Sequence, residues 1–227
     1  MRRAYVESHE PFTEALRLAL RWAGDTATIH APDTGSIKEN RLDQLGVPLT
    51  CASPRSKFHG RPRGTVVGTF LNLRDVLEVE RASGVDGLVV VQAHGPSAFP
   101  GVSHHGPWVT AFDAEHLGGQ EIAAIAAAEP ALRAAIRGLT GLAVGNQGLL
   151  DNRERSEVIH ALTFLRSRGF ALDPDALMVE ALRNDWGGTG PEDLRQIAID
   201  LSKGKQLRFD KGRLRPERLE EWAAAGT

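Results

Sequence analysis

Histidines gather in the segments that follow apolar runs of the sequence. Seven of the eight lie in such segments, and only His160 falls inside a clear helical pattern. The richest segment, HGPSAFPGVSHHG, follows the run GLVVVQA and contains His94 and His104. Imidazole exchanges protons near neutral pH and, when neutral, binds divalent metals. We therefore expect His94 or His104 to act as a proton shuttle, against the plainer interpretation that a histidine in a loop is simply solvated.

Two basic stretches have the composition of a surface that meets phosphate groups. The first, RSKFHGRPR at 55–63, has four cations, one histidine and no acid, and the second, at 203–218, has seven cations against two acids. Each contains a phenylalanine, Phe58 or Phe209, that would stack on a nucleic-acid base. The residues that we predict to bind phosphate are Arg55, Lys57, Arg61 and Arg63. The competing interpretation of both stretches is a solvated charged face.

Motifs that would define a reaction are absent from the sequence. It contains no HEXXH or CxxC metal motif, no GxGxxG or GxxxxGK[ST] phosphate loop, and no GxSxG nucleophile motif. The histidines and nearby acids have residue types that bind metals, but their spacing is not diagnostic. A metal-dependent hydrolase of a small molecule therefore stays an alternative rather than the first hypothesis.

The elements that would position these groups alternate between strands and helices in the first half of the chain. Strands are predicted at 2–8, 26–31, 47–52, 64–70, 87–93 and 107–112, and helices at 12–24, 37–46 and 73–84. This alternation implies a largely parallel sheet with helices on both faces. The carboxyl ends of parallel strands meet at one edge, where ligands bind in open α/β sheets.

After Gly119 the strand patterns stop and helical spacing takes over. Helices are predicted at 120–139 with a kink or break at Pro130, at 151–169, at 173–188, at 190–204 and from Pro216 onward. The fold class is therefore α/β, with a mostly parallel Rossmann-like sheet and flanking helices at 1–118. A small all-helical domain with a basic C-terminal tail is predicted at 119–227.

Composition limits the classes of function. A formal net charge of −2 excludes a generally basic nucleic-acid coat but leaves room for a local basic patch. The single cysteine, Cys51, excludes a disulfide framework and a multi-cysteine zinc site. No apolar run approaches the roughly 20 residues that cross a bilayer, and MRRAYVESHEPF lacks the apolar core of a secretory signal. We expect a cytoplasmic protein without a membrane association.

One acidic pattern is similar to that of a known domain. Glu7 closes the first apolar run, and DAEHLGG, with Asp113 and Glu115, follows the run at 107–112. This resembles topoisomerase–primase (Toprim) domains, in which a glutamate ends the first strand and a later strand ends in Asp-x-Asp-x-x-Gly. The resemblance implies that Glu7, Asp113 and Glu115 hold magnesium for phosphoryl transfer on nucleic acid. Glu115 departs from the pattern, no glycine follows Glu7, and a strand–helix–strand unit is inserted; the alternative is that Asp113 caps the next helix.

From about Gly64 onward the chain also resembles uncharacterised hypothetical proteins of actinobacteria. The similar stretches are TVVGTFLNLRDVLEVERASGVDGLVVVQ, AVGNQGLLDNRERSEVIHALTFLRSRGF and ALRNDWGGTGPEDLRQIAIDLSKGK. This likeness implies a bacterial protein of two parts and carries no activity with it.

Taken together, these patterns favour a nucleic-acid-associated or phosphate-ligand-binding protein, with magnesium as the cofactor if it is catalytic. The alternative is a non-catalytic adaptor or homo-oligomer. In that alternative Trp186 and Trp222, expected to be exposed at helix ends, would anchor a protein partner.

Overall fold

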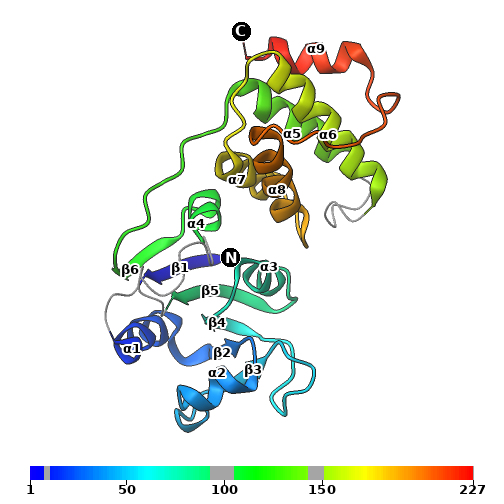
Figure 1. The fold of residues 1–227 in the computed structure, drawn as a ribbon. Coiled ribbons are helices and arrows are strands. Elements are labelled where there is room, and N and C mark those ends of the chain that lie inside the picture. The colour runs from blue at the N-terminus through cyan, green and yellow to red at the C-terminus, as the bar shows by residue number, and fades with distance from the viewer. Residues whose placement is uncertain (8–10, 93–104, 143–150, 227) are drawn as a thin grey trace. The chain divides into compact units, whose positions relative to one another are not determined.

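The computed structural model describes residues 1–7, 11–92, 105–142 and 151–226 (Figure 1). The chain divides into two compact units, Met1–Ala124 and Ile125–Thr227. This division lies a few residues beyond the predicted boundary at 118/119. No helix within the described ranges is long and apolar enough to cross a membrane.

The N-terminal unit contains a sheet of six parallel strands. They are β1 (Arg2–Glu7), β2 (Ala27–Ala31), β3 (Leu49–Cys51), β4 (Gly64–Thr69), β5 (Val85–Gln92) and β6 (Glu115–Gly119). Their order across the sheet is β3-β2-β4-β5-β1-β6, and every pairing is parallel. The sequence prediction of a parallel Rossmann-like sheet is therefore confirmed. Val66 and Val67 of β4 and Val89 and Val90 of β5 are buried on both faces of the sheet because helices cover both.

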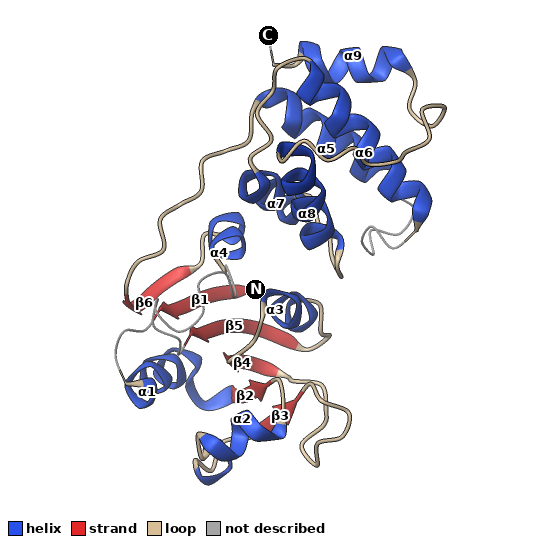
Figure 2. Ribbon diagram, in the orientation of Figure 1, coloured by secondary structure: helices blue, strands red, loops and turns tan. Residues whose placement is uncertain are grey.

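Helices cover the two faces of this sheet (Figure 2). They are α1 (Phe12–Ala23), α2 (Thr34–Glu39), α3 (Leu73–Glu80) and α4 (Gly106–Phe112). Figure 1 shows α1 and α2 on one face and α3 and α4 on the other. Buried Ile29, Val67 and Val89 from the strands pack with Leu16 and Ala19 of α1 to form the core on the first face. The helices therefore hold the strand ends in place by packing.

The segment at 107–112 is a helix, α4, and not the predicted strand. A short, mostly apolar run fits a buried strand or a buried helical turn equally well. Pro107 stands in the first turn of the helix, where its missing N–H has no intrahelical role, and the side chain of Trp108 is completely buried. The strand comes later, at Glu115–Gly119, and its exposed polar sequence gave no strand signal.

Two predicted helices begin at other residues in the structure, and the helix predicted at 173–188 ends at Arg183. The short helix expected at 37–46 begins earlier, at Thr34, where Asp33 accepts a hydrogen bond from the backbone of Ser36. Residues 121–129, although rich in alanine, have no helical structure. In this segment the backbone N–H of Ile122 donates to the hydroxyl of Tyr5 (3.0 Å), so tertiary contacts override helix propensity.

The C-terminal unit is helical. Its described helices are α5 (Pro130–Leu142), α6 (Asn152–Ser167), α7 (Pro174–Arg183), α8 (Gly190–Ser202) and α9 (Pro216–Ala224). Aspartates cap two of them: Asp151 accepts from the backbone of Glu154, and Asp173 accepts from that of Asp175 and Ala176. Leucine, isoleucine and alanine side chains from all five helices form a second core, separate from that of the sheet.

Trp186 and Trp222 belong to this second core, which corrects the expectation that they are exposed. Each side chain keeps 7% of its accessible surface. The indole N–H of Trp186 donates to the hydroxyl of Thr140 (2.6 Å). Trp222 lies against Gly138 of α5. Both residues stand at helix ends, but these ends turn inward, so neither indole is an anchor for a partner.

Candidate functional site

The three acids predicted to share magnesium are separated by the register of β1 and β6. Glu7 pairs with Gly119, whereas Glu115 pairs with Ala4. Three residues of strand, roughly 10 Å, lie between the two positions on β1. Asp113 precedes Glu115 and lies beyond the start of β6. The acids do not converge because the apolar run before Asp113 is a helix, which moves Asp113 and Glu115 to the amino edge of the sheet.

Asp113 and Glu115 have structural roles at that amino edge. Asp113 ends α4 in the left-handed conformation (φ 49°), which aspartate tolerates better than most residues, so it does not cap the next helix. The carboxylate of Glu115 accepts a hydrogen bond from the indole N–H of Trp22 (2.8 Å). Within the described ranges, no three His, Cys, Asp or Glu side chains are grouped so that they could hold a metal ion.

The structure describes the histidine segment only in part. His94 and His104 lie outside the described residues, so their predicted role as a proton shuttle stays a prediction. His105 is described and is almost completely buried, immediately before α4. His30, on β2, is also buried; its Nδ1 lies 2.8 Å from the hydroxyl of Thr50, and burial lowers its pKa to about 4.

Residues 52–63, which we call the basic loop, leave the carboxyl end of β3. Backbone bonds fix the start of the loop beside the end of β2: Ala52 N–H donates to Ala31 and Ser53 N–H to Pro32. Further on, Ser56 is buried and its hydroxyl accepts from Phe58 N–H (3.1 Å). The basic loop is therefore a folded element rather than a loose connection.

The cations of the basic loop project from this fixed backbone. Arg55, Lys57, Arg61 and Arg63 are all exposed. None of them forms an ion pair among the described residues, and no acid occurs between 52 and 63. The amine of Lys57 lies 4.6 Å from the centre of the Phe58 ring. The loop therefore presents cations without a counter-charge in the N-terminal unit, as a phosphate-binding segment would.

The four predicted phosphate ligands are not equivalent, however. Arg55 and Lys57 follow the carboxyl end of β3, on the edge where open α/β sheets bind ligands. Arg63 immediately precedes β4, so it stands at the amino edge; its carbonyl accepts from the hydroxyl of Thr28 (2.9 Å). The loop runs along the side of the sheet from the carboxyl ends of the strands to their amino ends. Arg63 therefore cannot join a site with Arg55 at the carboxyl ends.

Two aromatic residues that the sequence analysis did not single out lie at the carboxyl edge. Phe70 follows β4 with a left-handed backbone (φ 59°), which is unusual for a bulky side chain and stores strain. Its ring lies 4.8 Å from that of Phe12, the first residue of α1. The sequence contains no signal for this conformation, because phenylalanine rarely adopts it.

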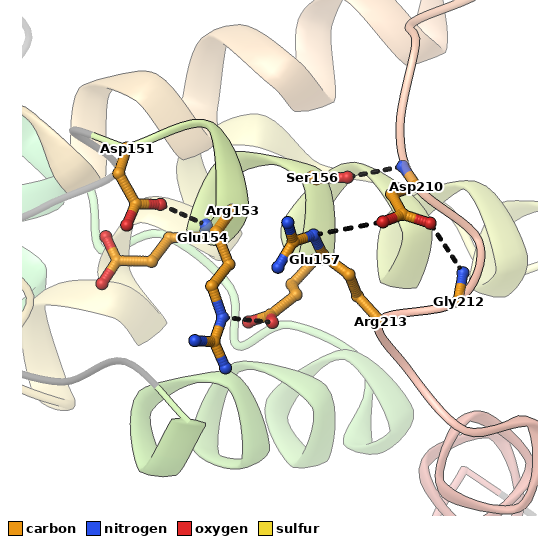
Figure 3. Close-up of polar contacts among 8 residues, drawn as sticks. All are labelled: Asp151, Arg153, Glu154, Ser156, Glu157, Asp210, Gly212 and Arg213. Carbon is orange, nitrogen blue, oxygen red and sulfur yellow. Dashed lines mark hydrogen bonds and ion pairs between the residues drawn. The ribbon is translucent and has the colours of Figure 1, made fainter.

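The second basic stretch, 203–218, is not a loose tail but is packed onto the helical unit. We call it the basic strap. Leu207, Phe209 and Leu214 face the core, whereas Arg208 and Lys211 are exposed. Figure 3 shows its turn at 210–213 beside α6. There the hydroxyl of Ser156 accepts from Asp210 N–H (2.6 Å), and the Asp210 carboxylate accepts from Gly212 N–H (3.0 Å).

The fold thus defines a protein of two units, a doubly wound parallel α/β sheet and a helical bundle with a basic strap. Residues 128–223, nearly all of the helical unit, match the model of a family described as a Domain of unknown function (DUF1889). This agrees with the expected likeness to proteins without an assigned activity, and the comparisons show no Toprim domain. No curated protein and no solved structure gives a significant match to the chain.

Proposed function

We propose that the N-terminal unit binds a phosphate-bearing ligand at the carboxyl edge of its sheet, through the basic loop. The observation that carries the proposal is the fixed backbone of residues 52–57 beside the ends of β2 and β3, with exposed cations that have no acidic partner. Exposed cations held on an ordered backbone lose less entropy when they bind an anion. Arg55, Lys57 and Arg61 are the proposed ligands, and Arg63 is left out.

In this proposal magnesium binds only together with the phosphates of the ligand. Magnesium in proteins is commonly bound by one or two carboxylates plus substrate phosphates. Of the three acids first considered, Glu7 alone stands at the carboxyl edge. The proposed function is therefore binding, and phosphoryl transfer by the three acids is not part of it. A cytoplasmic setting belongs to the proposal on the evidence of the single cysteine, Cys51, which is free and buried.

Titration calorimetry of the full chain with inorganic pyrophosphate and with a nucleoside triphosphate, each with and without Mg²⁺, tests the proposal. Substitution of Arg55, Lys57 and Arg61 together by glutamine should weaken binding about tenfold or more, because charge-assisted contacts to phosphate are lost. The matched control is Arg74→Gln, which removes an exposed cation that is already paired with Glu78 in α3. No detectable binding, or equal affinities of the wild type and the triple variant, would refute the proposal.

A further inference from the structure

The charges of the helical unit are segregated along its sequence. Between residues 125 and 227 there are 15 cations and 15 acids, so the unit has no formal net charge. The basic strap holds seven of the cations and two of the acids. The remainder of the unit holds eight cations and 13 acids. A neutral domain with this distribution presents one basic segment on an otherwise acidic body, which orients it toward a polyanion.

The packing of the strap decides which of its side chains reach solvent. Residues 205–210 form neither helix nor strand, and the exposure of successive side chains alternates. Leu207 and Phe209 are half-buried, whereas Arg208 and Asp210 are exposed. Lys211 and Arg215 are also exposed, on either side of buried Leu214. The apolar side chains thus hold the strap on the helical core while the cations face outward.

Three acids in or beside the strap are already engaged in ion pairs, whereas Glu217 forms none among the described residues. Asp210 is paired with Arg213 (3.5 Å) and bonded to the backbone of Gly212. Asp200, at the end of α8, is paired with Lys205 (2.8 Å). Glu220 of α9 pairs with Arg168. Within each of these pairs the two charges neutralise each other.

Five of the seven cations of the strap form no ion pair among the described residues, namely Lys203, Arg208, Lys211, Arg215 and Arg218. Lys203 is set apart from the other four because its charge lowers the pKa of nearby Asp200. Four exposed cations on an ordered segment therefore remain available to pair with an anionic partner.

The position of Phe209 further limits which kind of polyanion could bind to the strap. Its ring stacks on His160 of α6, with 4.9 Å between ring centres and 21° between ring planes. One face of the ring is therefore covered and the side chain packs on the helical core, so it is not an exposed platform for an unpaired base. The strap contains no other aromatic side chain. Proteins that grip single strands combine cations with exposed aromatic platforms. A cationic surface without exposed aromatic rings matches the phosphate backbone of a duplex better.

We infer that the basic strap of the helical unit is a docking surface for double-stranded nucleic acid, which contacts phosphates and reads no bases. This inference concerns the C-terminal unit and is independent of the phosphate ligand proposed for the basic loop. It predicts binding without sequence preference. With four phosphate contacts, the logarithm of the affinity should fall with the logarithm of salt concentration at a slope of about −3.6.

Fluorescence anisotropy of a labelled 20-base-pair duplex with the full chain, between 50 and 200 mM salt, tests this inference. The variant Arg208→Gln, Lys211→Gln, Arg215→Gln should lose at least about tenfold in affinity at 50 mM salt and show a shallower salt slope. The matched control is Arg17→Gln, Arg21→Gln, Arg74→Gln, which removes the same charge from exposed helix positions of the other unit and should stay within about twofold of the wild type. The conservative variant Arg208→Lys with Arg215→Lys, which retains both positive charges, should keep the wild-type affinity.

Four results would overturn the inference. They are an unchanged affinity of the strap variant, equal losses in both triple variants, binding to phosphatidylglycerol vesicles in the absence of duplex binding, and tighter binding of a single strand of equal length than of the duplex. Because the calorimetric test with pyrophosphate depends on the basic loop and the anisotropy test on the strap, either proposal can fail while the other holds.

Discussion

The imidazole of His160 lies on the ring of Phe209, and this stack joins α6 to the basic strap. Burial lowers the pKa of His160, nearby Lys211 lowers it further, and Asp210 opposes the shift. Its Nδ1 is buried and has no hydrogen-bond partner among the described residues. The stack is therefore stable with a neutral imidazole and should weaken when the ring becomes protonated.

The first prediction follows from this stack. Because the pKa of His160 is lower in the folded state, the unfolded chain binds the proton first, near the ordinary value of about 6.5. The stabilisation is complete above that pH and is lost as the pH falls toward the lower folded pKa. Amide hydrogen exchange of residues 205–213 should be faster at pH 5 than at pH 7.5, after correction for intrinsic rates.

In the variant His160→Phe the ring stack is kept and the titration is removed. The corrected exchange rates of the strap should then hardly depend on pH. His59→Gln, which removes an exposed histidine from the other unit, serves as the control and should behave as the wild type. Equal pH dependence in the wild type and His160→Phe would show that another group is responsible.

A second pH dependence is expected in the N-terminal unit. Burial of His30 lowers its pKa to about 4, so its contribution to stability is present above pH 6.5 and is lost between there and pH 4. A shift of this size corresponds to about 3 kcal/mol. Hydrogen exchange of the β2 and β4 backbone should report the loss, and His30→Gln should be less stable at pH 7 but nearly independent of pH over this range. A wild-type unit equally stable at pH 7 and pH 4.5 contradicts the prediction.

Two glycines of α5 provide a matched pair for a packing test. A β-carbon at Gly138 would lie 2.5 Å from Cζ2 of Trp222, whereas a β-carbon at Gly141 would meet no atom within 4 Å. Gly138→Ala should therefore destabilise the helical unit by about 1–3 kcal/mol through overpacking. Gly141→Ala should stabilise it by up to about 1 kcal/mol, because alanine restricts the unfolded chain and favours helix. Denaturant titration of the full chain measures both; the same sign for both would mean that Trp222 is not packed on α5.

The fourth prediction concerns Glu80, which joins three elements of the N-terminal unit. Its carboxylate accepts from Arg3 of β1 (3.0 and 3.1 Å) and from the indole N–H of Trp108 in α4 (2.9 Å). Glu80→Gln should cost about 2–3 kcal/mol of stability, since a largely buried ion pair is broken. Glu78→Gln, two residues away, breaks only an exposed pair with Arg74 and should cost less than about 0.5 kcal/mol. Equal unfolding midpoints for the two variants would argue against the buried pair.

The local order of elements could largely be predicted from the sequence, because hydrophobic periodicity and capping residues act over a few neighbours. The parallel sheet, the change to helices in the second half, the aspartate cap at Asp173 and the turn at Asp210 all follow from such patterns. The exposed cations of 55–63 were likewise evident, since no acid accompanies them in the chain.

Long-range contacts, by contrast, were decided only by the tertiary structure. Whether PWVTAF is a strand or a helix depends on what buries Trp108, and this choice moved Asp113 and Glu115 away from Glu7. The inward orientation of Trp222 and Phe209 depends on Gly138 and His160, which are distant in the sequence. Sequence patterns specify which side chains are apolar or charged, but the partner that buries or neutralises each of them is chosen when the elements pack.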